Sequence, residues 1–158
     1  MKNLIFALSA LMLASPLAGC GFTPLYADTV NSGQIQIEKI EGRSGHALRK
    51  ELIQYLAVGL PGLEGPATLT IALDENLNRL TFKPDEAASR TDVVAVADYV
   101  LVIDDGAITG EVRVETTFNV PDEPFADIAA QSDASSRAMQ LMARRLVDDM
   151  RIKLANQK

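Results

Sequence analysis

The sequence predicts an α+β protein: a two-layer sandwich in which two helices lie on one face of a four-stranded, mainly antiparallel sheet. The predicted order is β-α-β-β-β-α. Residues 110–120 alternate between apolar and polar side chains, which is typical of a strand with one wet face. Residues 129–155 instead repeat apolar side chains at helical spacing. Helices segregated to one face of such a sheet make a two-layer domain.

The first half of the domain is predicted to hold one strand and one helix. Residues 34–40 alternate and indicate the first strand. Gly42–Gly45 indicates a turn, in which Ser44 can cap a helix. That helix ends before Gly59 and Pro61. Its apolar positions recur at helical spacing: Leu48, Leu52, Tyr55 and Leu56.

Three strands and a helix follow. Residues 68–74 alternate and predict the second strand, which residues 76–84 can extend as one arm of a hairpin. Residues 91–104 are rich in valine and predict a long third strand. Asp105-Gly106 is a two-residue hairpin signal, because both residues accept left-handed conformations. The fourth strand turns one set of side chains to the core: Val112, Val114, Thr116, Phe118 and Val120.

The last helix follows the segment Pro121–Pro124, which stops the sheet. We expect its apolar stripe, methionines included, to pack in the core: Ala138, Met139, Met142, Ala143, Leu146, Val147, Met150 and Leu154. Basic residues lie on its exposed faces and toward its C-terminus, where cations favour the helix dipole: Arg137, Arg144, Arg145, Arg151 and Lys153.

The N-terminus has the features of a secretion signal. An apolar run, residues 4–14, is long enough for a signal-peptide core but too short to span a bilayer of roughly 30 Å. Leu17-Ala18-Gly19-Cys20 is similar to the lipobox of bacterial lipoproteins. We therefore expect residues 1–19 to be removed and Cys20, the one cysteine of the chain, to be acylated. The alternative is an ordinary secretory signal with an incidental cysteine.

Residues 20–33 are predicted to form a lipidated tether. Gly21 stands where aspartate retains a lipoprotein at the inner membrane in the sorting systems that this signal resembles, so we expect the outer membrane. Phe22, Leu25 and Tyr26 either pack on their own domain or dock on a partner or on the membrane surface.

Composition limits what the rest can be. Removal of the signal leaves 158 − 19 = 139 residues, so residues 34–158 are one ordinary domain that can bury a core. The formal charge changes from −6 to −7 because Lys2 is lost. An acidic chain argues against nucleic acid as a partner, since sequence-blind binding depends on basic contacts to phosphate.

The sequence contains no recognisable catalytic or metal-binding pattern. There is no P-loop and no dinucleotide fingerprint. His46 is the only histidine, cannot supply a metal triad, and is expected to face solvent in the first helical turn. The acid pairs Asp104-Asp105 and Asp148-Asp149 belong to a turn and to a helix surface. We expect no enzyme, no cofactor and no metal.

Three basic residues, Arg79, Lys83 and Arg90, flank the connection between the second and third strands. They form either a solvated hairpin tip or a small cluster that meets phosphates or the rim of a protein partner. Asp85 and Glu86 lie between them and dilute the positive field.

Two segments and the pattern of elements resemble a known family. The mature chain starts with Cys20-Gly21-Phe22-Thr23-Pro24-Leu25-Tyr26, and Arg43–Arg49 opens a helix. A three-strand run then leads to a terminal helix that contains Ala143-Arg144-Arg145-Leu146. Over essentially the whole mature chain, these features resemble the LPS-assembly lipoproteins of the LptE type, in their alphaproteobacterial form.

The resemblance implies a lipoprotein on the periplasmic face of the outer membrane. Such proteins plug and help to assemble an LptD-type β-barrel, and they bind lipopolysaccharide on its way to the cell surface. Only Cys20 is carried over, as the acylation site. A plug needs a projecting, mostly polar element, and the hairpin over residues 76–91, with Arg79, Lys83 and Arg90, is our candidate for barrel or lipopolysaccharide contact. The alternative is an outer-membrane structural or envelope-interaction lipoprotein without a lipopolysaccharide role.

Overall fold

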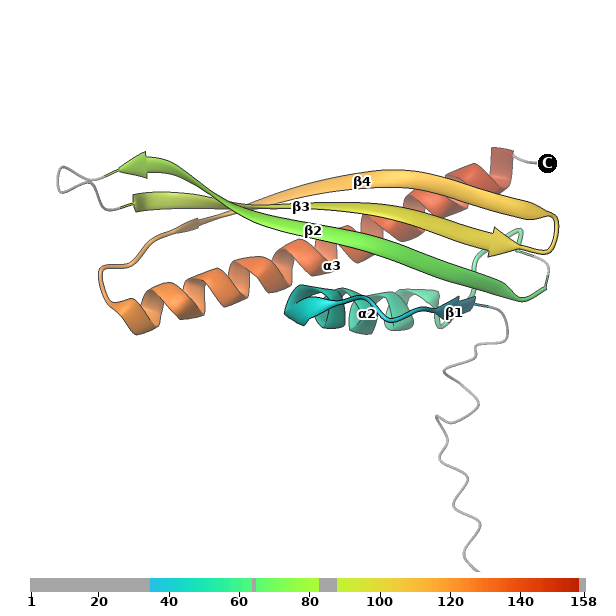
Figure 1. The fold of residues 1–158 in the computed structure, drawn as a ribbon, viewed down its shortest axis with the longest axis horizontal. Helices are drawn as coiled ribbons and strands as arrows, with labels where there is room; N and C mark the ends of the chain where they lie inside the picture. The colour runs from blue at the N-terminus through green and yellow to red at the C-terminus, as the bar shows by residue number, and fades with distance from the viewer. Residues whose placement is uncertain (1–34, 64, 83–87, 157–158) are drawn as a thin grey trace, which may run out of the picture.

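The structure is a computed structural model that describes residues 35–63, 65–82 and 88–156. Its strands are β1 (Ile35–Ile37), β2 (Ala67–Phe82), β3 (Ala88–Ile103) and β4 (Gly106–Asn119), and its helices are α2 (Gly42–Leu56) and α3 (Pro124–Asn156) (Figure 1). The predicted signal peptide, the acylation site Cys20, the tether and Lys83 lie outside the described residues. Within the described part, neither helix is long and apolar enough to cross a membrane.

The four strands form one sheet in the order β1-β2-β3-β4. β1 runs parallel to β2, whereas β2, β3 and β4 are joined by antiparallel pairing. Both helices lie on the same side of the sheet, below it in Figure 1. The predicted α+β class, element order and two-layer arrangement are therefore confirmed.

The core lies between the sheet and the two helices. Every second residue of the long strands faces it, including Leu69 and Ile71 of β2 and Val93, Ala95, Ala97, Tyr99 and Leu101 of β3. The inward set predicted for β4 is confirmed, because Val112, Val114 and Phe118 are buried and Thr116 and Val120 are half-buried. All eight residues of the predicted α3 stripe are buried. Each large apolar side chain of this kind stabilises the fold by about 1.5–3 kcal/mol.

Several local boundaries differ from the sequence prediction. β1 pairs over only three residues, because the chain leaves the sheet after Ile37 to enter α2. The helix begins at Gly42 rather than after a cap at Ser44, whose hydroxyl instead donates to Glu75. The β3–β4 turn is Asp104-Asp105, since Ile103 pairs with Gly106.

α3 begins at Pro124, five residues before the predicted start. Proline is well tolerated in the first turn of a helix, because its missing amide hydrogen would have no partner there. The stop signal for the sheet is therefore also the start of the helix.

The lengths of the elements decide which part of the sheet is covered. A helix of 15 residues spans about 22 Å, whereas a strand of 16 residues spans about 53 Å. The 33 residues of α3 span about 50 Å, so α3 follows the whole sheet and α2 only part of it (Figure 1). Beyond the start of α2, the helix-side face of the sheet is covered by α3 alone. We call this region the distal end; it comprises residues 75–82, 88–93 and 124–136.

The outer edge of β4 is protected by basic side chains of α3. Arg145 donates to the main-chain oxygen of Arg113 at 2.8 Å, and Lys153 donates to that of Thr109 at 2.9 Å. Unpaired carbonyls on an edge strand are a template for pairing with another chain. Two of the α3 cations that the sequence places on exposed faces therefore also close this edge.

Candidate partner-binding surface

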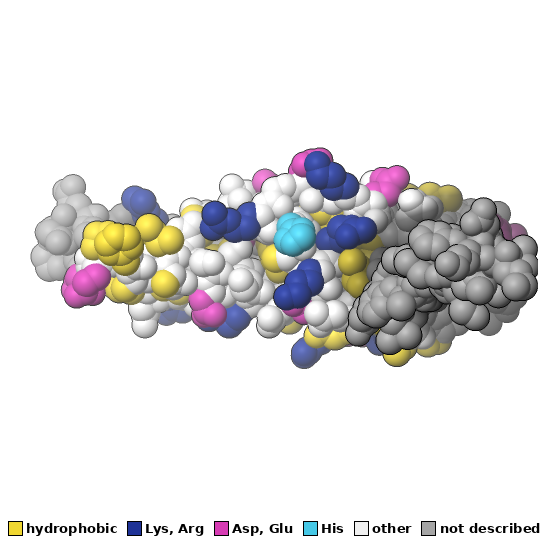
Figure 2. All heavy atoms as spheres, turned by 90° about the horizontal axis from the view of Figure 1, so that it is seen from below, with side chains coloured by type: hydrophobic (Ala, Val, Ile, Leu, Met, Phe, Trp, Pro, Cys, Tyr) yellow, Lys and Arg dark blue, Asp and Glu magenta, His cyan; other side chains and the backbone are white. Residues whose placement is uncertain are grey.

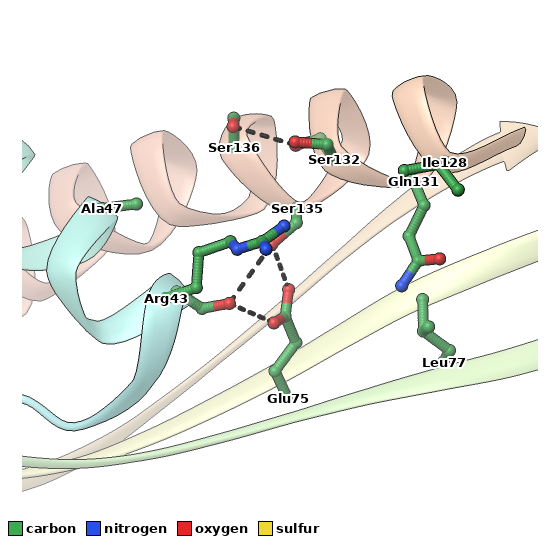
Figure 3. Close-up of a pocket in the computed structure, with 10 residues that line it drawn as sticks. Arg43, Ala47, Glu75, Leu77, Ile128, Gln131, Ser132, Ser135 and Ser136 are labelled. Carbon is green, nitrogen blue, oxygen red and sulfur yellow. Dashed lines mark hydrogen bonds between the residues drawn. The ribbon is translucent and has the colours of Figure 1, made fainter. Parts of the chain in front are cut away.

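A pocket of about 410 Å³ opens where α2 begins. It exists because α2 is short: its first turn, the middle of β2 and the first third of α3 surround a space that a longer helix would fill (Figure 3). The lining mixes hydroxyl, amide, charged and apolar groups: Arg43, Ser44, Ala47, Glu75, Leu77, Ile128, Gln131, Ser132, Ser135 and Ser136.

Glu75 joins the three elements at the floor of the pocket. Ser135 of α3 donates to Glu75 Oε1 at 2.6 Å, and Ser44 of α2 donates to Glu75 Oε2. The two serine hydroxyls lie 3.4 Å apart (Figure 3). Both carboxylate oxygens are thus occupied by hydroxyl donors, and Glu75 forms no ion pair with a described residue. Because the network ties α2 and α3 to β2, it keeps the mouth of the pocket in shape.

An apolar rim continues from the pocket to the distal end. Phe125 and Ile128, in the first turns of α3, are 87% and 62% exposed, and Leu77 and Leu80 of β2 are 46% and 51% exposed. Figure 2 shows apolar side chains gathered at the end of the molecule where α3 begins. Single exposed apolar residues are ordinary, but two of these four, Leu77 and Ile128, line the pocket, which makes this region a candidate site for a partner.

The outer edge of β2 is open next to this rim. β1 pairs only with Ala67, Thr68 and Leu69, and Glu38 adds one further bond to Leu69. From Ile71 to Phe82, no strand among the described residues pairs with this edge. An unpaired strand edge beside an apolar groove can accept an extended segment of another protein.

The two described basic residues of the predicted hairpin cluster do not project together. Arg79 is in register with Thr91 and therefore shares its face of the sheet, whereas Arg90 is the next residue along β3 and projects to the other face. Both side chains are exposed. Whether they contact a barrel or lipopolysaccharide stays a prediction.

His46 is exposed in the first turns of α2, where the sequence places it. No group of three or more histidine, cysteine, aspartate or glutamate residues that could hold a metal is present among the described residues. The acid pair Asp104-Asp105 forms the β3–β4 turn, as expected.

A polar cluster at the opposite end of α3 has a structural role. Asp149 accepts hydrogen bonds from Tyr99 at 2.6 Å and from Lys153 at 2.7 Å. Partial burial opposes ionisation of Asp149, but these two hydrogen bonds outweigh it and hold its pKa below the usual value. Burial and the bond to Asp149 raise the pKa of Tyr99. Lys153 also lies 5.2 Å from the centre of the Tyr99 ring. The cluster fastens α3 to β3.

Sequence reasoning did not single out the residues that make the pocket. Glu75 lies within an alternating strand, and Ser135 lies in a polar stretch at the start of the last helix. A signal for the rim was present, since Phe125 and Ile128 continue the apolar phase of the α3 stripe, five helical turns before Ala143 and Leu146, and yet are exposed. The convergence of these residues depends on how far α2 extends, which sequence periodicity does not determine.

The fold defines a class of protein: a small two-layer α+β domain with the architecture of known bacterial lipoproteins. The chain is similar to a protein from Caulobacter crescentus CB15 described as a candidate lipoprotein, with 26% identity, coverage of 77% of this chain and 90% of that one, and a TM-score of 0.61. No protein-family model and no curated protein matches the chain.

Two more distant structures share the fold. Rare lipoprotein B from Shewanella oneidensis has 9% identity and a TM-score of 0.60, with coverage of 78% of this chain and 96% of that one. A minor lipoprotein from Acinetobacter baumannii has 13% identity and a TM-score of 0.56, with coverage of 78% and 94%. The similarity covers nearly the whole of each lipoprotein.

Proposed function

We propose that this chain is a lipoprotein, acylated at Cys20 and held on the periplasmic face of the outer membrane, that plugs and helps to assemble an LptD-type β-barrel. In this role it assists delivery of lipopolysaccharide to the outer leaflet and acts without catalysis, cofactor or metal. The lipobox and the similarity to lipoprotein structures support the anchor. The barrel partner rests on the family resemblance and on the surface at the distal end.

One observation carries the proposal: the distal end combines exposed apolar side chains, a pocket and a stretch of the β2 edge that pairs with no described strand. Of the exposed apolar residues at this end, Ile128 and Leu77 line the pocket, and Leu77 and Leu80 belong to the stretch of β2 whose outer edge pairs with no described strand. A β-barrel with an extended loop or strand can bury the rim and pair with the edge. The two long strands β2 and β3 support the surface, so it is held rigidly at one end of an elongated molecule (Figure 1).

Photo-crosslinking in living cells tests the barrel contact. A photo-reactive amino acid at Phe125 or Leu80 should capture a β-barrel protein of much larger mass. The same amino acid at Val102, which is also exposed but lies at the opposite end of β3, is the control and should not. Capture from Val102 alone would place the docking surface elsewhere and contradict the proposal.

Acylation has its own test. The Cys20→Ser chain should not incorporate a clickable palmitate analogue and should accumulate as an unprocessed precursor. Fatty-acid labelling that persists in this variant would refute the anchor.

One finding favours the alternative of an envelope lipoprotein without a lipopolysaccharide role. Arg79 and Arg90 project to opposite faces, so these two residues do not form a joint phosphate site. Reversing the charges of Lys83 and Arg90 distinguishes the two functions. Weaker lipopolysaccharide binding with an intact barrel complex supports the delivery role, whereas unchanged binding excludes this hairpin as the lipid contact.

A further inference from the structure

A cationic stripe runs along the solvent side of α2. Arg43, His46 and Lys50 recur at intervals of three and four residues, and all three are exposed. Neither Arg43 nor Lys50 forms an ion pair with a described residue, and the first turn of α2 contains no acidic residue. Figure 2, which looks onto the helix layer, shows lysine and arginine side chains on several sides of His46.

α3 extends this surface. Arg137 and Arg144 are both exposed on it. Interaction with Tyr55 of α2, and to a smaller extent with Asp148 of its own helix, raises the pKa of Arg144. Arg137 pairs with Asp133 in its own helix. We call Arg43, Lys50 and Arg144 the cationic helix face.

The position of Arg43 has a local cost. It lies in the first turn of α2, at the positive end of the helix dipole, where acidic rather than basic residues are favourable. The Arg43 guanidinium forms no ion pair with a described residue, although Arg43 lines the same pocket as Glu75 (Figure 3). A residue that opposes local electrostatics is expected at a functional site.

The opposite surface of the molecule is acidic. The exposed side chains of the sheet face that the helices leave uncovered include four carboxylates, Asp74, Asp98, Glu111 and Glu115, and two cations, Arg90 and Arg113. The chain as a whole has a formal charge of −6. The positive charge of an acidic protein is therefore concentrated on the helix layer, which gives the molecule a preferred orientation at an anionic surface.

The chain enters the domain on the same side. The first described residue, Ile35, lies in β1, the edge strand beside α2 (Figure 1). Cys20 precedes it by 15 residues, a length that spans at most about 50 Å when extended and about 21 Å on average as a flexible coil. A lipid at Cys20 would thus keep the helix layer within reach of the membrane surface.

We propose that the cationic helix face binds the anionic phospholipid headgroups of the membrane to which the chain is attached. The surface fits phosphate groups in a plane, because its cations are exposed and project from two neighbouring helices. The distal end stays free in this orientation, so one protein can contact the membrane and a barrel with different surfaces. The inference goes beyond the proposed function and does not require a barrel.

The test measures binding of the unlipidated chain, so that the anchor does not contribute. The chain without residues 1–19 and with Cys20→Ser keeps every described residue of the domain. It should sediment with vesicles of phosphatidylcholine and phosphatidylglycerol but not with phosphatidylcholine vesicles, and high salt should release it. Each basic residue near an anionic surface contributes about fivefold to affinity, so Lys50→Gln should weaken binding about fivefold and Arg43→Gln with Lys50→Gln about 25-fold.

Arg113→Gln is the matched control, since it removes one exposed cation from the acidic sheet face and should leave vesicle binding unchanged. Equal losses for Lys50→Gln and Arg113→Gln would show that binding follows net charge alone and would overturn the inference. The inference would also be overturned if the double variant, Arg43→Gln with Lys50→Gln, lost binding to purified lipopolysaccharide but kept binding to the phosphatidylglycerol vesicles. Barrel capture from Phe125 in the same double variant separates the two proposals, because it should persist if only membrane binding is lost.

Discussion

Gly110 of β4 lies directly against the ring of Tyr99 in β3. A Cβ atom added at residue 110 would come 2.6 Å from Tyr99 Cε1 and 2.7 Å from the Asp149 carboxylate. The two residues are in register across the β3–β4 ladder. The missing side chain at this point lets Tyr99 reach Asp149, and so makes room for the contact between the sheet and the last turns of α3.

Gly110→Ala should therefore destabilise the protein. The Tyr99 ring is buried and cannot move aside freely, so we expect a loss of about 1–3 kcal/mol in the free energy of unfolding. Urea denaturation measures it. Thr109→Ala, next along the same strand but exposed, is the control and should change stability by no more than about 0.5 kcal/mol. Equal losses would show that the close approach to Tyr99 is unimportant.

The ionisation of Asp149 predicts a dependence of stability on pH. The pKa of Asp149 is lower in the folded chain than in the unfolded chain. The ionised carboxylate therefore stabilises the fold fully at pH values above the unfolded-chain pKa. This stabilisation is lost as the pH falls through the folded-chain pKa. Asp149→Asn should lower stability at pH 7 by no more than about 1 kcal/mol, because the Lys153 and Asp149 side chains are 35% and 31% exposed and solvent partly screens the pair. The difference between the two proteins should disappear in strongly acidic solution. A constant difference at every pH would mean that the charge of Asp149 does not contribute.

The sequence was sufficient to predict the elements and their faces, because those depend on local periodicity. The alternation in β4 and the stripe of α3 identified the buried side chains correctly, from Val112 to Leu154. The errors concern boundaries, where local signals compete. Ser44 has the side chain of a helix cap, but tertiary contact with Glu75 takes its hydroxyl, and the helix starts two residues earlier.

The candidate surface could be predicted only in part. The hairpin was expected to project, and β2 and β3 are indeed the longest strands of the sheet. The pocket could not be predicted, because it exists only beyond the start of α2, where α3 alone continues over the sheet. Ile128 and Leu77 are about fifty residues apart in the chain, and no local pattern connects them.

The hydroxyl network at Glu75 should contribute to stability through one serine and not through its neighbour. Ser135→Ala removes the 2.6 Å bond to a carboxylate and should cost about 1 kcal/mol or somewhat more. Ser136→Ala removes only a bond to the main-chain oxygen of Ser132 in the same helix and should have little effect. Thermal unfolding of the two variants checks this. A larger effect at Ser136 would exclude Glu75 as the tie between β2 and α3.

Two adjacent substitutions in β4 test which face of the sheet is buried. Val112 is 8% exposed in the layer between the sheet and α3, so Val112→Asp places a charge there without a partner. We expect a loss of more than about 3 kcal/mol in the free energy of unfolding, measured in urea, or failure to fold. The Arg113 side chain is exposed, and its guanidinium lies 3.9 Å from the Glu115 carboxylate. The main-chain oxygen of residue 113, which accepts a hydrogen bond from Arg145, is still present after the substitution. Arg113→Asp should therefore cost no more than about 1 kcal/mol. If both variants lost stability equally, the assignment of the helix-covered face would be wrong.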